Sequence, residues 1–422
     1  MRNLGQNDFK NILKAEIDRI DNAKITKRNE KIIEGFTQHP CPRAIIDGKE
    51  VIIFNSNDYL GLRHNKKLKN AEHSASKKYG SGPGAVRFIS GSMKIHSELE
   101  KEIASFHDRE DAVIFSSAFA VNFGVLHCLI KGQSKDSLVT DKTLVISDEL
   151  NHRSIIDGIR VAGIAKENKA IFRHLDMEDL KRVLEENKGK FSRVLIVSDG
   201  IFSMLGEYQN ISSLHNVAKH YDNFYEEGVM TIIDDAHGVA CFGKKGRGCE
   251  EYTKGRCDIL IGTFGKGFGA DGGYVTGDKI FMDYIRESAA TYIYSNPISP
   301  GTAGAALESV KLVNSRSGSR LLNRLSENIA YFKEDMRSAG FSFAASSMHA
   351  IQPILIADPV KTKALTDSLF EKGILVTNIN YPVVAKGKDE IRVQLNAMHT
   401  KEDIDYFVKT CSELARQLEI IN

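Results

Sequence analysis

The sequence predicts an α/β fold, in which a large, mostly parallel sheet is covered by helices on both faces and is followed by a smaller α+β domain. Apolar, strand-like runs alternate with helix-length segments from about residue 70 to residue 258, which is the pattern of a parallel sheet. Several runs, such as VLIVS and MTIID, are almost continuously apolar, as expected of strands buried on both faces. After Pro300 the pattern changes to long helical stretches and short strands, which indicates the second domain.

The expected elements follow one another in a simple order along the chain. A polar, helix-forming segment covers residues 1–25, and six strand-like runs follow at 51–54, 112–115, 143–147, 193–198, 229–234 and 258–262. A long helical stretch is expected over 301–339, then a strand over 351–357, a helix over 360–372, two short strands and a terminal helix over 401–418. We therefore predict a helical arm with a first strand over 1–55, a large domain over 56–300 and a small C-terminal domain over 301–422.

Composition excludes several classes of protein. Lys plus Arg is 57 and Asp plus Glu is 55, so the formal charge of +2 predicts no nucleic-acid partner. The six cysteines are scattered singly, which favours reduced thiols over a disulfide framework or a zinc site. No signal peptide and no apolar run near the roughly 18 residues of a membrane span are found, so we expect a cytoplasmic protein without a membrane span.

The first candidate for chemistry is Lys266, which follows an apolar strand and stands between Gly265 and Gly267. Most lysines are solvated surface groups, but a strand that ends in a glycine-flanked lysine delivers the amine to the ligand-binding edge of a sheet. A partly desolvated amine has a lowered pKa and is suited to Schiff-base formation. The short spacing before Lys266 and the glycine after it argue against a phosphate-binding P-loop, and so against an ATPase.

The second candidate is Asp234 with His237, directly after the buried strand over 229–234. The Asp-x-x-His spacing alone is also compatible with metal ligands, but no further ligand stands at suitable spacing, and no metal is expected. A carboxylate and a histidine at a strand end suit a cofactor with a pyridinium nitrogen and a phenolic oxygen. This cofactor is pyridoxal 5'-phosphate (PLP).

Two further strand ends complete the predicted site. The strand over 112–115 turns through two serines into a helix, whose first N–H groups are a plausible phosphate cradle, although serine is also simply a good N-cap. His152 ends another strand and could stack on a flat cofactor, although a lone histidine at such a place is more often structural.

Together these segments resemble the α-oxoamine synthase family of fold type I PLP-dependent transferases, whose architecture is that of aspartate aminotransferase. The resemblance runs from about residue 54 to the C-terminus, with its motifs in the family's order. The motifs are NDYLGL at 57–62, YGSGPGAVRFISG at 79–91, HSELE at 96–100, DGIFSM at 199–204, DDAH at 234–237, TFGK at 263–266 and YSN at 294–296.

The resemblance implies a role for each matching residue. Lys266 would bind the cofactor and transfer protons, Asp234 would face the pyridine nitrogen, and His152 would stack on the ring. His237 and Ser203 would lie near the phenolic oxygen. Ala118 and Phe119 would offer backbone N–H groups, and Thr263 its hydroxyl, to the phosphate. Ser295 would reach the phosphate of a neighbouring subunit's cofactor, which implies a homodimer with shared active sites. Asn57 and Arg392 would hold the carboxylate of an amino acid.

Within the family, VRFI at 86–89 and the segment at 378–387 look most like glycine C-acetyltransferase, also called 2-amino-3-ketobutyrate CoA ligase. That branch predicts condensation of glycine with acetyl-CoA, or the reverse cleavage as in threonine catabolism. The segment at 263–269 instead reads like 8-amino-7-oxononanoate synthase, so the alternative is condensation of an amino acid with a longer acyl thioester, of that type or of the serine palmitoyltransferase type. Leu205, where the family usually has an acid, and apparent insertions at 132–142 and 223–228 depart from the pattern. An inactive family member is the remaining alternative, and the retention of Lys266 argues against it.

Overall fold

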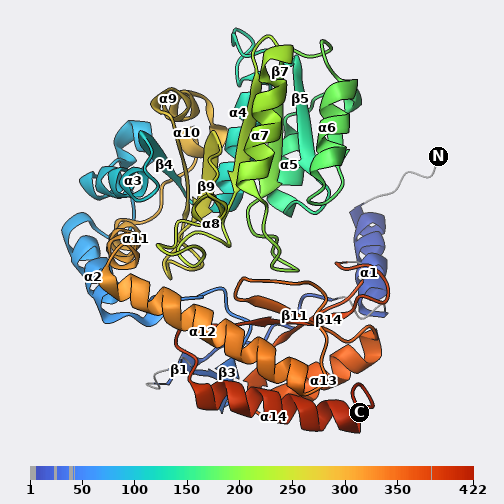
Figure 1. Ribbon diagram of the computed structural model, residues 1–422. Helices are drawn as coiled ribbons and strands as arrows, with labels where there is room; N and C mark the ends of the chain where they lie inside the picture. The colour runs from blue at the N-terminus through green and yellow to red at the C-terminus, as the bar shows by residue number, and fades with distance from the viewer. Residues whose placement is uncertain (1–5, 23–25, 38–40, 42, 382) are drawn as a thin grey trace.

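A computed structural model describes residues 6–22, 26–37, 41, 43–381 and 383–422 of the chain. Two bodies of structure lie one above the other in Figure 1, a large sheet domain and a smaller domain beneath it. The predicted residues 1–5 and 23–25 of the N-terminal helical segment lie outside the described residues.

The large domain is built on a seven-stranded sheet with the strand order β4-β10-β9-β8-β7-β5-β6. Only β10 runs antiparallel to its neighbours, so the mostly parallel sheet predicted from the sequence is confirmed. In chain order the strands are β4 (Asp111–Phe115), β5 (Thr143–Asp148), β6 (Lys169–Phe172), β7 (Arg193–Asp199), β8 (Val229–Asp234), β9 (Ile259–Thr263) and β10 (Gly273–Gly277).

Helices bury both faces of this sheet. Alternate residues of β7 belong to two different cores: Leu195 and Val197 to one, Val194 and Ile196 to the other. This double burial explains why the central strands read as continuous apolar runs. The helices are α2 (Lys66–Tyr79), α3 (Lys94–Phe106), α4 (Ala118–Lys131), α5 (Arg153–Val161), α6 (Met177–Glu186), α7 (Ile211–Tyr221), α8 (Cys249–Thr253), α9 (Lys279–Ser288) and α10 (Ala290–Ile293), with short helical turns at Leu62–His64, Arg87–Gly91, Lys166–Asn168 and Asp222–Phe224.

The smaller domain combines helices with two small sheets. One sheet has the order β11-β14-β13, with all pairs antiparallel, and its strands are β11 (Ile351–Leu355), β14 (Glu390–Gln394) and β13 (Thr377–Ile379). The other has the order β1-β2-β3-β12, with β1 (Gly35–Phe36), β2 (Arg43–Ile46), β3 (Lys49–Ile53) and β12 (Ile374–Leu375). The helices of this domain are α12 (Arg316–Ser338), α13 (Pro359–Glu371) and α14 (Lys401–Gln417). The helix α11 (Pro300–Val313), which precedes them, packs on α2 and α3 of the large domain (Figure 1).

The pairing of β3 with β12 joins segments that are far apart in the sequence. Ile52 and Ile53 lie opposite Ile374 and Leu375 in a parallel register, so the one strand expected in the N-terminal arm completes a sheet of the C-terminal domain. The division of the chain at residues 55 and 300 remains a proposal.

Three elements differ from the sequence expectation. The helical stretch over 301–339 is two helices, because the side chain of Ser315 caps the start of α12 and interrupts the run. The strand β6 lies at the sheet edge, where a half-exposed KAIF segment gives little apolar signal. The strand β10 contains two glycines in five residues, and one is required: a Cβ on Gly273 would lie 2.3 Å from the backbone nitrogen of Ala118.

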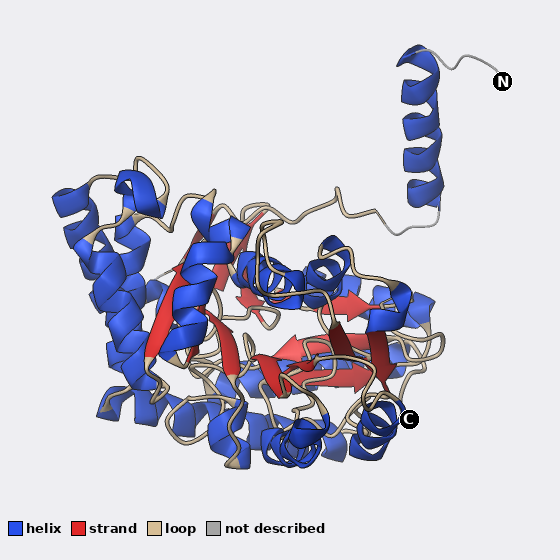
Figure 2. Ribbon diagram, turned by 90° about the horizontal axis from the view of Figure 1, so that it is seen from above, coloured by secondary structure: helices blue, strands red, loops and turns tan. Residues whose placement is uncertain are grey.

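The N-terminal helix α1 (Gln6–Asn22) stands apart from the body of the molecule (Figure 2). Phe9, Ile12, Leu13 and Ile17 on this helix are exposed. Among the described residues, no helix combines the length and apolarity that crossing a membrane requires.

Candidate active site

A hollow opens at the carboxyl ends of the central strands, which is where parallel sheets bind ligands. The segments after β5, β7 and β8, the loop after β9 and the start of α4 all contribute to it. Six of the predicted residues meet there. The lining residues are Ala118, Phe119, His152, Ser154, Asp199, Ile201, Asp234, Ala236, His237 and Lys266.

Lys266 enters the hollow from the loop that follows β9 (Ile259–Thr263). Burial lowers the pKa of its amine, while the negative charges of Asp234 and Asp199 oppose that shift. The loop is packed tightly: a Cβ on Gly267 would lie 3.0 Å from the carbonyl oxygen of Val239. A desolvated amine held between carboxylates is prepared for a carbonyl group, as the sequence predicted.

Asp234 and Asp199 form a pair of buried acids at adjacent strand ends. They stand opposite each other in the parallel register of β8 and β7, and both side chains line the hollow. Burial raises the pKa of Asp199 well above its ordinary value, and the neighbouring charge of Asp234 adds to the shift. The backbone N–H of His152 donates to Asp199 at 3.1 Å. Sequence reasoning quoted the motif that contains Asp199 but gave this residue no role.

His237 is held from below by the smaller domain and by the segment that precedes α2. Its Nδ1 lies 2.7 Å from the hydroxyl of Tyr59, and its backbone carbonyl accepts a hydrogen bond of 2.8 Å from Nε2 of His349. Burial lowers the pKa of His237 well below its ordinary value, and the positive charges of Lys266 and Arg392 act in the same direction. The imidazole is therefore neutral. Neither Tyr59 nor His349 was singled out from the sequence.

His152 occupies the N-cap position of α5 at the side of the hollow. Burial lowers its pKa and the nearby charge of Asp234 opposes the shift. A neutral, oriented imidazole at this position has the flat surface that stacking on a ring requires.

The start of α4 provides the predicted anion-binding end of a helix. Ser117 caps the helix by accepting from the backbone N–H of Ala120 at 3.1 Å, and the N–H groups of Ala118 and Phe119 come at the first turn, where α-helices leave them unpaired. The hydroxyl of Thr263 is engaged within its own loop, because it donates to the carbonyl of Gly272 at 2.8 Å. The expectation that this hydroxyl binds phosphate therefore requires it to exchange partners.

Arg392 and Asn57 lie at the wall between the two domains, each with part of its hydrogen-bonding capacity committed. Nε of Arg392 donates to the backbone carbonyl of Ser203 at 2.6 Å. Oδ1 of Asn57 accepts from Nε2 of Gln394 at 2.5 Å. Arg392 also interacts with the hydroxyl of Tyr59 through a side-chain hydrogen bond. The remaining N–H groups of the guanidinium and the amide nitrogen of Asn57 are the groups with donors to offer. The charge of Arg392 also contributes to the lowered pKa of Lys266, so the two cations lie in the same site.

Neither Ser203 nor Ser295 is among the residues that line the hollow. Ser203, which was expected near the phenolic oxygen of the cofactor, lies in the loop after β7 and accepts a hydrogen bond from Arg392 through its backbone carbonyl. Ser295 follows α10 and is outside the hollow of its own chain. Its neighbour Tyr294 is 71% exposed.

The residues present fit PLP on the geometry of the hollow itself. One buried cavity joins an amine of lowered pKa, a carboxylate for a ring nitrogen, two neutral histidines and a helix N-terminus for a phosphate. Each of these groups matches one functional group of PLP, and the match does not depend on any single residue.

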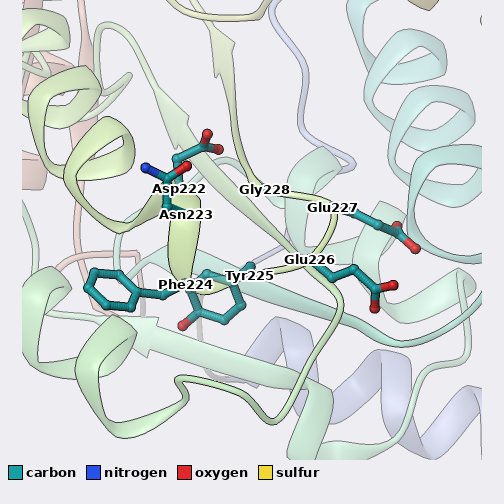
Figure 3. A pocket seen from close by; sticks show the side chains of 7 residues that line it. All are labelled: Asp222, Asn223, Phe224, Tyr225, Glu226, Glu227 and Gly228. Atoms are coloured by element: carbon teal, nitrogen blue, oxygen red, sulfur yellow. The ribbon is translucent and has the colours of Figure 1, made fainter.

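A second hollow, at the opposite end of β8, is unrelated to this chemistry. Residues 222–228 line it (Figure 3), and they include the insertion noted at 223–228. It lies before Val229, whereas Asp234 ends the same strand, so roughly 20 Å of extended chain separates the two sites. Glu227 in this segment forms an ion pair with Arg193. The side chains of this hollow therefore stabilise the start of the strand.

Comparison with known proteins gives consistent results. The sequence pattern of the family described as aminotransferase class I and II matches residues 49–410. The chain is 38% identical over 379 residues to an 8-amino-7-oxononanoate synthase of Thermosipho melanesiensis, which covers 89% of this chain and 91% of the relative. An 8-amino-7-oxononanoate synthase of Treponema denticola is also 38% identical, over 392 residues, with 92% of this chain and 93% of the relative covered.

Solved structures with the same fold come from related enzymes. A lysine-to-alanine variant of serine palmitoyltransferase from S. paucimobilis with a bound PLP–myriocin aldimine superposes with a TM-score of 0.85 at 25% identity, covering 97% of this chain and 98% of that one. The 8-amino-7-oxononanoate synthase from Francisella tularensis gives a TM-score of 0.70 at 25% identity, covering 87% and 98%. The predicted fold type I architecture is confirmed.

Proposed function

Since this chain belongs to the α-oxoamine synthase family of PLP-dependent enzymes, within the class I and II aminotransferases, we propose that it condenses an α-amino acid with an acyl thioester. In this reaction a new carbon–carbon bond joins the amino acid Cα to the acyl carbonyl carbon. The thiolate leaves and takes up a proton, and with a decarboxylating course the amino-acid carboxylate leaves as carbon dioxide. The products are then an α-amino ketone, the free thiol and carbon dioxide.

The observation that carries the proposal is the set of donors left open by Arg392 and Asn57. The backbone carbonyl of Ser203 holds Nε of Arg392, and Gln394 holds Oδ1 of Asn57. The N–H groups that these bonds do not use, on Arg392 and Asn57, are donors that can bind a carboxylate. A guanidinium whose charge acts on Lys266, together with the amide of Asn57, suits the carboxylate of an amino acid, because an arginine fork binds a carboxylate in bidentate fashion. The carbon next to that carboxylate would then lie within reach of the amine.

The other residues of the hollow divide the remaining work. Lys266 would hold the cofactor, and its amine would take the proton from the amino-acid Cα. Asp234 holds a proton at the ring nitrogen, His152 covers one face of the ring, and neutral His237 offers a hydrogen bond at the phenolic oxygen. Bound PLP supplies the conjugated system that absorbs the electron pair of the deprotonated carbon. The N–H groups of Ala118 and Phe119 orient the phosphate.

We further propose that the acyl chain of the donor is longer than acetyl. This is the alternative considered above, and the relatives named 8-amino-7-oxononanoate synthase and the serine palmitoyltransferase structures support it. These relatives give no support to the glycine C-acetyltransferase expectation, in which glycine is condensed with acetyl-CoA. In this proposal glycine is one candidate for the amino acid, and CoA is one candidate for the thiol that carries the acyl group.

Exposed apolar side chains also support a homodimer with shared active sites. Phe88 and Ile89, in the turn at Arg87–Gly91, are 66% and 65% exposed, and Arg87 lies over the ring of Tyr292 in the segment that leads to Ser295. Burying such side chains is favourable by about 1.5–3 kcal/mol each, so a second copy is a suitable cover. In this arrangement Ser295 would contribute to the site of the partner subunit.

The test of the proposed function combines two substrate series. Thiol release is measured with glycine, alanine and serine against acyl-CoA donors from acetyl to palmitoyl. The proposal predicts that kcat/KM rises with chain length beyond acetyl, with carbon dioxide released in equal amount to the thiol. Maximal activity with acetyl-CoA would overturn the long-chain assignment, and no thiol release with any donor would overturn the reaction itself.

A further inference from the structure

A chain of hydrogen bonds beside the hollow passes through the buried Asn122 and connects three of the lining residues, Asp234, Ser154 and His152. Nδ2 of Asn122, in α4, donates to Oδ2 of Asp234 at 2.6 Å and to Oγ of Ser154 at 2.8 Å. Oγ of Ser154, in the first turn of α5, lies 2.7 Å from Nδ1 of His152. Asn122 has no exposed surface and Ser154 is 1% exposed. Three separate elements of the sheet domain are thus joined by one amide group.

The direction of these bonds fixes the proton on the histidine. Because Asn122 uses an N–H to donate to Ser154, the proton of the serine hydroxyl is free to point to Nδ1 of His152. The backbone N–H of Ser154 also points to that atom at 3.3 Å. Nδ1 of His152 therefore accepts, and its neutral imidazole carries its proton on Nε2.

The residue type at position 122 is specific to this task. Both neighbours of Nδ2 present acceptor oxygens, so the position needs two donors on one group. An aspartate would place acceptors there, and a further negative charge beside Asp234 and Asp199. The amide also has a cost, since Oδ1 of Asn122 is buried without a hydrogen-bond partner among the described residues. A buried unsatisfied oxygen is expected to destabilise the fold, which argues that the two donors are retained for function.

We propose that Asn122 is a positioning residue that fixes the Asp234 carboxylate for the cofactor ring nitrogen and, through Ser154, fixes the His152 imidazole for the ring face. The inference rests on the roles proposed above for Asp234 and His152. It goes beyond them because it couples the two contacts: one amide sets the orientation of both groups. Replacing Asn122 should therefore change two properties together: the protonation of the cofactor ring nitrogen and the stacking of His152 on the ring.

The test uses apo-protein titrated with PLP, so that it does not depend on the identity of the substrates. The variants are Asn122→Leu, which removes both branches, and Ser154→Ala, which removes the histidine branch alone. Asp234→Asn and His152→Ala serve as references for the two contacts. Asn328→Leu is the matched control, because Asn328 also donates two hydrogen bonds from Nδ2, at 3.0 Å each, to the carbonyls of Asn396 and His399 in the smaller domain.

Asn122→Leu should raise the dissociation constant of PLP at least about tenfold, and should move the pH titration of the visible band of the bound cofactor upward. The upward direction follows because a less firmly held Asp234 stabilises the protonated ring nitrogen less, and the imine nitrogen then retains its proton to higher pH. Ser154→Ala should weaken binding less and leave the titration close to that of the unmodified protein. Asn328→Leu should change neither quantity.

The possible results distinguish an error in the proposed role of Asn122 from an error in the proposed roles of Asp234 and His152. If Asp234→Asn and His152→Ala perturb the cofactor but Asn122→Leu leaves both the affinity and the titration unchanged, the coupling through Asn122 is wrong. If the two reference variants also leave both quantities unchanged, the proposed roles of Asp234 and His152 are wrong. Should Asn122→Leu fail to fold, Ser154→Ala decides: an unchanged PLP affinity in that variant overturns the coupling.

Discussion

The floor of the site, at the ends of the sheet strands, and its wall, on β14 of the smaller domain, differ in how fully the carboxylates of Asp234 and Glu390 are paired. On the floor, Asp234 already accepts two hydrogen bonds, from Asn122 at 2.6 Å and from the N–H of Ala236 at 3.0 Å. On the wall, both carboxylate oxygens of Glu390 and Oε1 of Gln394 are buried without a hydrogen-bond partner among the described residues.

From this difference we infer which part of the reaction the floor and the wall each serve. The floor is organised in the absence of any ligand, as is required of a surface that holds one constant cofactor. The wall retains unused donors and acceptors on the strand that carries Arg392, which is where substrates would be distinguished. The family can therefore be inferred from the floor, whereas we propose that the choice of amino acid and acyl donor depends on the wall.

The largest expected effect comes from breaking the floor at its reactive group. Lys266→Ala should abolish the visible absorption of the cofactor bound through lysine and reduce kcat at least about 1,000-fold, because the amine is both the attachment point and the base. Absorption spectra and single-turnover assays measure the two effects. Lys333→Ala is the control, since Lys333 is also a half-buried lysine whose pKa burial lowers, but it bonds to Ser347. Retention of both the band and turnover in Lys266→Ala would contradict the assignment.

A smaller and more selective loss is expected on the wall. Arg392→Lys keeps the charge but removes the fork, so kcat/KM for the amino acid should fall roughly 10- to 100-fold, mainly through KM. The visible band should be retained. Steady-state kinetics with the amino acid varied test this, and Arg416→Lys is the control because Arg416 likewise donates through Nε to a backbone carbonyl, far from the site. An unchanged KM in Arg392→Lys would remove Arg392 from the carboxylate site.

The next effect concerns stability at the rim of the floor. Burial alone would lower the pKa of His174, but hydrogen bonds to Asp148 at 2.9 Å and Glu207 at 3.2 Å raise it to about 9. A histidine whose pKa is raised on folding adds stability below its unfolded pKa of 6.5 and loses it as pH rises through 9. His174→Gln should therefore lower the free energy of unfolding by about 2 kcal/mol at pH 6, with a shrinking difference towards pH 10. A constant difference across denaturant titrations at both pH values would refute the ion pairs.

The smallest expected effect is an increase in the free energy of unfolding, opposite in sign to the effect of His174→Gln. Burial raises the pKa of Glu390 from its ordinary value of 4.5 to about 7, so the wall loses stability as pH rises from 4.5 through 7. Glu390→Leu should raise the free energy of unfolding by about 1 kcal/mol at pH 8 and flatten its pH dependence, because it removes a buried carboxylate without a partner. Thermal melts at pH 5 and pH 8 provide the comparison. Destabilisation of this variant at pH 8 would show that Glu390 has a partner in solution.

The sequence predicted the floor far better than the wall, and for physical reasons. Strands buried on both faces can be recognised in the sequence as apolar runs. A polar residue that follows such a run lies at the edge of the sheet where ligands bind, and this rule identified Lys266, Asp234 and His152. The strands β6 and β10 were missed because one is half-exposed and the other is rich in glycine. Contacts such as Gln394 with Asn57 join residues 337 positions apart and leave no signal in a single sequence.

Asn122 and Tyr59 were missed for a related reason. Asn122 lies inside a helix, where an asparagine looks like an ordinary polar position, and only the fold shows that both of its N–H groups are used. Tyr59 was quoted as part of a motif, but its contact with His237 depends on how the segment before α2 meets the strand ends.

The most direct measurement of the central claim is the release of free thiol from a series of acyl-CoA donors of increasing chain length, with the amino acid held saturating and carbon dioxide monitored in parallel. The account predicts that thiol and carbon dioxide appear in equal amounts and that kcat/KM is greater for long chains than for acetyl. Preference for acetyl-CoA, or thiol release without carbon dioxide, would contradict it.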